Sequence, residues 1–91
     1  MESQLTYTLA DGREFQVPSD PDMRLMREHT AAALTAYGFP VATKTLSTMA
    51  TRGGGPLFSH FGPRTLYRWG DALDWARGRL TPPRHSTSEA A

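Results

Sequence analysis

The stretch that decides the fold runs from residue 43 to residue 68 and reads TKTLSTMATRGGGPLFSHFGPRTLYR. Its first part predicts a helix over Thr43–Arg52. At about 100° per residue, Leu46, Met49 and Ala50 fall on one narrow apolar arc of this helix. The glycines and the proline that follow cannot continue a helix, so we expect it to end at Arg52.

The side of this helix opposite the apolar arc carries hydroxyls and cations and no carboxylate. Its members are Lys44, Ser47, Thr48, Thr51 and Arg52. Short hydroxyl side chains let a helix approach a duplex closely and bond phosphates or base edges, and cations replace condensed counterions. We therefore interpret it as a DNA recognition helix, with Thr43 as its cap and as a further DNA contact. A plain solvated face is the alternative.

The rest of the stretch predicts a β-hairpin. Two short strands, Leu57–Phe61 and Thr65–Arg68, flank a turn at residues 62–64. A hairpin that follows a basic helix has the sequence form of a wing, with Arg64 at its tip and His60 and Arg68 on its arms as DNA contacts. The alternative is an ordinary turn whose arginine points into water.

A first helix is expected immediately before the recognition helix. Asp20 as N-cap and a proline at the first helical position predict a helix over Pro21–Tyr37. Its apolar stripe would comprise Met23, Met26, Ala33, Leu34 and Tyr37. Gly38 supplies a stop and Pro40 prevents continuation, so the short link to Thr43 is typical of a helix-turn-helix.

The two ends of the chain complete the expected organisation. Alternating apolar residues around Asp11-Gly12 predict an N-terminal β-hairpin over residues 1–18, whose inner side chains are Leu5, Tyr7, Leu9, Phe15 and Val17. Asp71 is expected to cap a last helix that buries Ala72, Leu73, Trp75, Ala76 and Leu80, and both tryptophans are expected in structural roles. The fold class is therefore α+β, a winged helix-turn-helix over residues 19–80 with a disordered tail at 81–91.

Composition bounds the function. The chain has 91 residues and a net charge of +1, but residues 1–22 carry five carboxylates and one arginine, whereas residues 41–70 carry four cations and no acid. This asymmetry favours a polyanion partner on one face. Without cysteine and with three scattered histidines, we expect no metal site, no cofactor and no enzyme activity. No apolar stretch or signal-type start is present, so we expect a cytoplasmic protein, nucleoid-associated when bound, with no membrane partner.

The motifs TLSTM (45–49), RGGGPLF (52–58) and FGPRTLYR (61–68), with Asp71 and Trp75, closely resemble the winged helix-turn-helix proteins of the MerR-like excisionase family. The resemblance covers about residues 24–80 and is most specific from Arg52 to Tyr67. Residues 67–75 and 84–89 are similar to directionality factors of rhizobial integrative and conjugative elements. The N-terminal hairpin is not part of the family pattern.

The resemblance implies an excisionase, or recombination directionality factor. Several copies would bind double-stranded DNA side by side, head to tail, and bend an attachment site so that a partner integrase excises a mobile element. One alternative is a transcriptional regulator of excision and transfer genes with the same fold. Another is a protein-binding adaptor, such as the DNA-recognition part of a phage packaging subunit, whose working surface would be the N-terminal hairpin.

Overall fold

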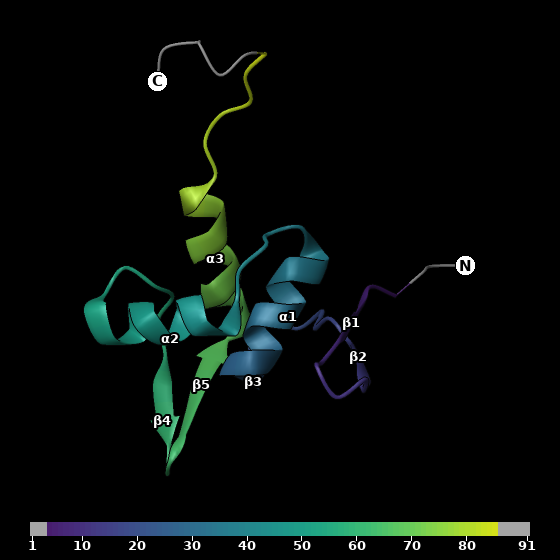
Figure 1. Cartoon of the computed structure of the whole chain (residues 1–91), viewed down its shortest axis with the longest axis vertical. Coiled ribbons are helices and arrows are strands. Elements are labelled where there is room, and N and C mark those ends of the chain that lie inside the picture. Colours follow the sequence, from purple (N-terminus) through teal and green to yellow (C-terminus); the bar gives the residue numbers. More distant parts are fainter. Residues whose placement is uncertain (1–3, 86–91) are drawn as a thin grey trace.

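Three helices and two small antiparallel sheets make up residues 4–85, the part of the chain that the computed structural model describes (Figure 1). In chain order the elements are β1 (Thr6–Thr8), β2 (Glu14–Gln16), β3 (Arg24–Met26), α1 (Arg27–Tyr37), α2 (Thr43–Arg52), β4 (Ser59–Phe61), β5 (Arg64–Arg68) and α3 (Trp69–Arg79). β1 pairs with β2, and the second sheet has the order β3-β5-β4. This α+β arrangement is compatible with a winged helix.

The predicted N-terminal hairpin is confirmed over its described residues. β1 and β2 are antiparallel, with Tyr7 opposite Phe15. Tyr7, Leu9 and Val17 belong to the main core cluster, and the hairpin packs on α1. Leu5 departs from the prediction because it is 46% exposed.

A contact between Tyr7 and α1 fixes this hairpin. The Tyr7 hydroxyl lies 2.8 Å from His29 Nδ1, and the ring of His29 meets those of Tyr7 and Phe15 edge-on. Because a two-stranded unit is marginal alone, this aromatic cluster supplies the packing that the hairpin requires.

The predicted start of the first helix at Pro21 is wrong. Asp20 caps a turn instead, its Oδ1 accepting from the Asp22 N–H at 2.9 Å and its carbonyl from the Met23 N–H at 3.1 Å. The chain then forms β3, which pairs antiparallel with β5. Helix α1 therefore begins only at Arg27. Pairing with a strand some forty residues later overrides the local helix signals.

Helix α1 is the central element of the core. Ala33 and Leu34 are fully buried, as predicted, whereas Met23 precedes the helix and is half exposed, and Tyr37 is also exposed. Gly38 ends α1 as predicted, its N–H donating to the carbonyls of Leu34 and Thr35.

Helix α3 closes the core from the other side. Trp69, Ala72, Leu73 and Ala76 are buried against α1 and β5, which confirms the structural role of Trp69. Two details of this helix were predicted wrongly. It begins at Trp69, so Asp71 lies in the first turn instead of capping it, and Leu80 is 68% exposed just beyond the last turn. Residues 81–85 form no helix or strand, and the remaining tail residues, 86–91, lie outside the described part.

Candidate nucleic-acid interface

Helix α2 occupies the residues that the sequence predicts, Thr43–Arg52, and a single buried side chain holds it to the core. Leu46 is fully buried, and Met49 and Ala50 beside it are half buried. Thr43 does not cap the helix: it is the first helical residue, and the cap position falls on Ala42, which offers no side-chain hydrogen bond. The predicted capping role of Thr43 is therefore wrong.

A threonine hydroxyl sets the link between α1 and α2. Thr35 Oγ1 accepts from the Val41 N–H at 3.2 Å, and contacts the carbonyl oxygens of Val41 at 3.2 Å and Ala31 at 2.9 Å. This one hydroxyl ties the link to the helix that precedes it. Sequence reasoning missed Thr35, although a threonine in the last turn of a helix is a side chain that can bond nearby backbone groups.

Hydrogen bonds fasten the loop after α2 to α2 itself and to α3. The Gly53 N–H donates to the Met49 carbonyl at 2.7 Å, and Trp75 Nε1 on α3 donates to the Gly54 carbonyl at 2.7 Å. A Cβ on Gly55 would lie 2.9 Å from Met49 Cβ, closer than side chains pack, so this position requires glycine. The glycine run therefore lets the chain double back tightly against α2.

The outward side of α2 carries polar side chains only. Its exposed residues are Thr43, Lys44, Thr45, Ser47, Thr48, Thr51 and Arg52. The structure thus brings together on one helix all six predicted contacts from this stretch. Neither Lys44 nor Arg52 forms an ion pair with any described residue. These two charges are consequently free to attract an anion.

The hairpin predicted after α2 is present as β4–β5 and extends away from the helices (Figure 1). Phe61 pairs with Arg64, so the turn contains only Gly62 and Pro63. Arg64 is therefore the first residue of β5. The prediction that Arg64 lies in the turn is wrong. The guanidinium of Arg64 is exposed, and its Nη1 lies 3.2 Å from the sulfur of Met26 on β3.

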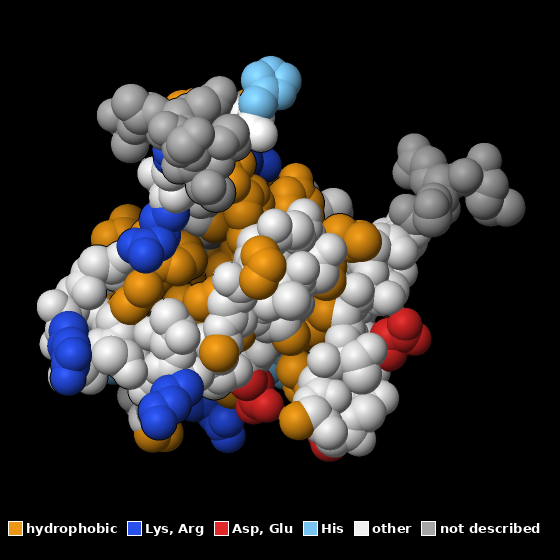
Figure 2. All heavy atoms as spheres, turned by 45° about the horizontal axis from the view of Figure 1, so that its top comes forward, with side chains coloured by type: hydrophobic (Ala, Val, Ile, Leu, Met, Phe, Trp, Pro, Cys, Tyr) orange, Lys and Arg blue, Asp and Glu red, His pale blue; other side chains and the backbone are white. Residues whose placement is uncertain are grey.

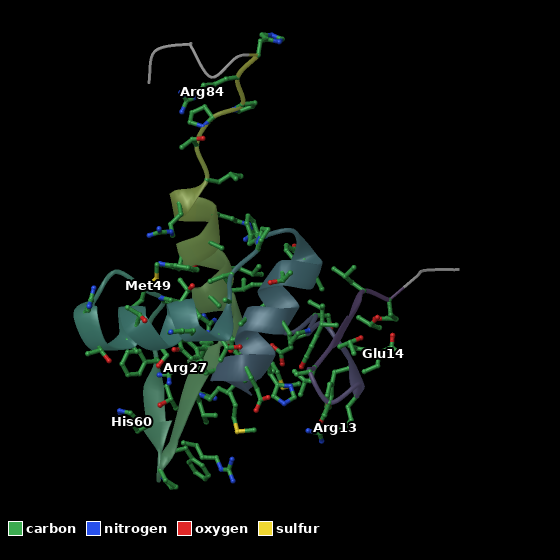
Figure 3. All side chains as sticks on the ribbon, viewed as in Figure 1. Arg13, Glu14, Arg27, Met49, His60 and Arg84 are labelled. Carbon is green, nitrogen blue, oxygen red and sulfur yellow. The ribbon has the colours of Figure 1, made fainter. Side chains whose placement is uncertain are left out.

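The two faces of the hairpin carry different predicted residues. Directly paired side chains lie on the same face of an antiparallel sheet and successive ones alternate. Arg64 and Arg68 therefore share one face, whereas His60 lies on the other, where its ring meets Phe58. Figure 3 shows His60 projecting from β4. The structure does not bring His60 and Arg64 onto a common face.

Arg68 differs from the other predicted cations because two carboxylates hold it. Its Nε donates to Asp22 at 2.9 Å and its Nη1 to Asp71 at 3.1 Å, which connects the turn before β3 to the first turn of α3. The hydrogen bond that Arg68 donates to Asp22 also raises the pKa of the Arg68 guanidinium. This pairing gives Arg68 a structural role at the base of the sheet.

Two arginines that sequence reasoning left out lie close to this surface. Arg24 on β3 is exposed and pairs with Arg68 across the sheet, which places it on the same face as Arg64. Arg27 begins α1 and donates from Nε to the Tyr67 hydroxyl at 3.0 Å (Figure 3). The signal that could have found Arg24 is the turn-forming Asp-Pro-Asp that precedes it.

Charges separate in space as they do in sequence. The acidic β1–β2 hairpin and α2 lie on opposite sides of α1 (Figure 1). In Figure 2 lysine and arginine side chains concentrate in the left half of the view, and carboxylates lie toward its centre and right. An approaching polyanion would therefore meet the α2 side with little repulsion.

An apolar groove of about 690 Å³ separates α2 from α3, and Figure 2 shows apolar side chains exposed along it. Phe39, Met49, Trp75 and Leu80 are among its lining residues. Residues 4–85 contain no group of three or more histidine, aspartate or glutamate side chains able to hold a metal ion. None of their helices combines the length and apolar character that crossing a bilayer demands.

Comparison of the chain with family models, with curated proteins and with solved structures finds no match.

Proposed function

We propose that this chain is a winged-helix protein that binds double-stranded DNA with α2 and the β4–β5 hairpin and serves as a recombination directionality factor. Helix α2 would enter the major groove with Lys44, Ser47 and Thr48 foremost. The hairpin would lie along the neighbouring phosphates or minor groove through Arg64. Arg68 would orient the hairpin instead of contacting DNA, since two carboxylates already hold it.

The observation that carries this proposal is the composition of the outward side of α2. Its cations have no carboxylate partner within residues 4–85, and its hydroxyl side chains are short enough for the helix axis to approach base edges. A helix serving only to cover the core would gain from glutamate–lysine pairs on such a face, and α2 contains no acid.

A domain of this size has limited discriminating power when one copy binds. One short helix reads only a few base pairs, so selectivity would come from several copies on adjacent sites. Such an array can bend the duplex, at a deformation cost of about 1 to 10 kcal/mol that additional contacts offset. The bend would bring integrase sites together, and the integrase would perform strand cleavage.

Titration of the full chain against its element's attachment region in a mobility-shift assay at several salt concentrations tests DNA binding. Lys44→Ala and Arg64→Ala should each weaken binding to all sequences and reduce the salt slope by about 0.9. Arg13→Ala is the matched control, because Arg13 is exposed but lies on the acidic hairpin, paired with Asp11. Equal slopes for all variants would remove α2 and the hairpin from the interface.

The reading role of α2 has its own test. Replacing Ser47 or Thr48 should change which sequences are preferred while leaving the salt slope intact. A footprint with several consecutive sites beside the attachment site supports a directionality factor. One isolated site near a promoter would instead indicate a transcriptional regulator built on the same contacts.

A further inference from the structure

An aromatic side chain projects into water at the end of the β4–β5 hairpin. Phe61 is 74% exposed, more than any other large apolar residue of the described chain. Phe58, three residues earlier, packs against Tyr67 and His60, but no aromatic ring in residues 4–85 contacts Phe61. Phe61 therefore contributes little to the folded core, and its ring is accessible to a partner.

The hairpin holds the backbone of Phe61 in a defined place. The turn beyond Phe61 has only two residues, and Gly62 adopts a φ of 61° that favours glycine at this position. Pro63 follows with its backbone φ restrained by the ring. A tip built this way loses little conformational freedom when it meets a partner.

The surroundings of Phe61 indicate the chemistry of that partner. Arg64 is its direct cross-strand neighbour on the same face, and neither ion pair nor carboxylate among the described residues neutralises it. No acidic residue occurs between residues 41 and 70. An apolar ring beside a free cation suits a partner that combines negative charge with flat apolar faces, as phosphates and stacked base pairs do.

We propose that Phe61 is a wedge that inserts between base pairs from the minor groove and kinks the duplex, while Arg64 contacts the adjacent phosphate. This inference rests on the proposed DNA-binding function and assigns its bending step to one side chain. Inserted apolar side chains partly unstack a base step, and pyrimidine–purine steps such as TA unstack most easily. The wedge would consequently place the bend at such steps.

The test compares four full-length chains: wild type, Phe61→Ala, Phe61→Leu and Leu57→Ala. Leu57 is the matched control because it is 72% exposed but precedes β4 and lies away from the tip. The probes are end-labelled duplexes of about 30 base pairs with a central TA step or with an A-tract in its place. Affinity and end-to-end energy transfer, which reports the bend, are measured for each chain with each duplex.

Wild type should bend the TA duplex and bind it more tightly than the A-tract duplex. Phe61→Ala should lose the bend and weaken binding to the TA duplex by about five- to a hundredfold. Phe61→Leu should retain part of both, since leucine can also act as a wedge. Leu57→Ala should match wild type.

Two results would overturn the wedge and leave DNA binding intact. The first is a Phe61→Ala chain that bends the TA duplex as wild type does. The second is a Phe61→Ala defect confined to the number of copies bound per duplex, which would assign the ring to a contact between neighbouring copies. If wild type binds neither duplex nor its attachment region, the proposed function itself fails. Equal urea stability of wild type and Phe61→Ala confirms that the fold is unchanged.

Discussion

Gly55 offers a sharp test of how the loop after α2 packs, because one substitution should have opposite effects at two glycines. A Cβ at position 55 would lie 2.9 Å from Met49 Cβ, 3.7 Å from its sulfur and 3.8 Å from its backbone carbon. The nearest atom is not the end of a flexible side chain, so either the loop or the last turn of α2 must move. Gly55→Ala should therefore cost about 1 to 3 kcal/mol, the usual cost of overpacking.

Gly78→Ala is the matched control. Gly78 lies in the last turn of α3, and a Cβ there meets nothing within 4 Å. Alanine should stabilise the protein at this position by up to about 1 kcal/mol because it restricts the unfolded chain. Urea titration followed by circular dichroism gives the free energy of unfolding of both variants.

A second-site change identifies the contact responsible. Met49→Ala keeps the Cβ and should not relieve the Gly55→Ala penalty, whereas Met49→Gly removes it and should show favourable coupling in a double-mutant cycle. A Gly55→Ala protein at least as stable as wild type would refute the reasoning. Such a result would mean that the loop can accept a Cβ at position 55 without a clash with Met49.

Two further predictions concern the core and the N-terminal hairpin. Leu46→Ala should cost about 3 kcal/mol in urea titration because Leu46 is fully buried, whereas Leu57→Ala should stay within about 0.5 kcal/mol; similar costs would mean that Leu46 does not anchor α2. Burial raises the pKa of the Tyr7 hydroxyl above its ordinary 10.0. The folded state therefore keeps this proton longer than the unfolded chain, so its contribution to stability is full below pH 10.0 and is lost as the pH rises through the folded pKa. Tyr7→Phe should be about 1 kcal/mol less stable at neutral pH, since the contact with His29 disappears. Its free energy of unfolding should also fall less steeply at alkaline pH. The same fall in the variant and in wild type would contradict this role of the Tyr7 hydroxyl.

Turn residues, glycines and prolines predict those helices and strands whose ends depend on neighbouring residues. The bounds of α2 follow from its glycine run and from the proline before it, and the N-terminal hairpin follows from alternation around Asp11-Gly12. Each of these devices acts over a few neighbouring residues, so it can be read without knowing the rest of the fold.

The error at the start of the first helix involves partners distant in sequence. β3 forms because Arg24–Met26 meets β5, and backbone bonds from Trp69 to Met23 and from Gly70 to Pro21 continue that alignment. The sequence predicts Asp71 as a helix cap, whereas Asp71 accepts a hydrogen bond from Arg68 in an ion-pair network that extends to the distant Asp22. The hydrophobic pattern of a short stretch of sequence does not reveal such pairings.

On the candidate surface, too, some residues can be predicted from local sequence and others depend on the assembled sheet. The outward residues of α2 could be predicted because a helix projection needs only the local sequence. The separation of His60 from Arg64 depends on strand register, and the addition of Arg24 depends on the third strand. Register and strand order are properties of the assembled sheet.

The hydrogen bond from Trp75 to Gly54 gives this protein an intrinsic optical reporter. The indole of Trp75 is half exposed and has the Arg79 guanidinium 5.2 Å from its ring centre, whereas Trp69 is almost completely shielded. The two fluorophores should therefore differ in emission wavelength and in access to a soluble quencher. In a Trp69→Phe background, the remaining emission would follow rearrangement of the glycine loop in real time and without an attached dye.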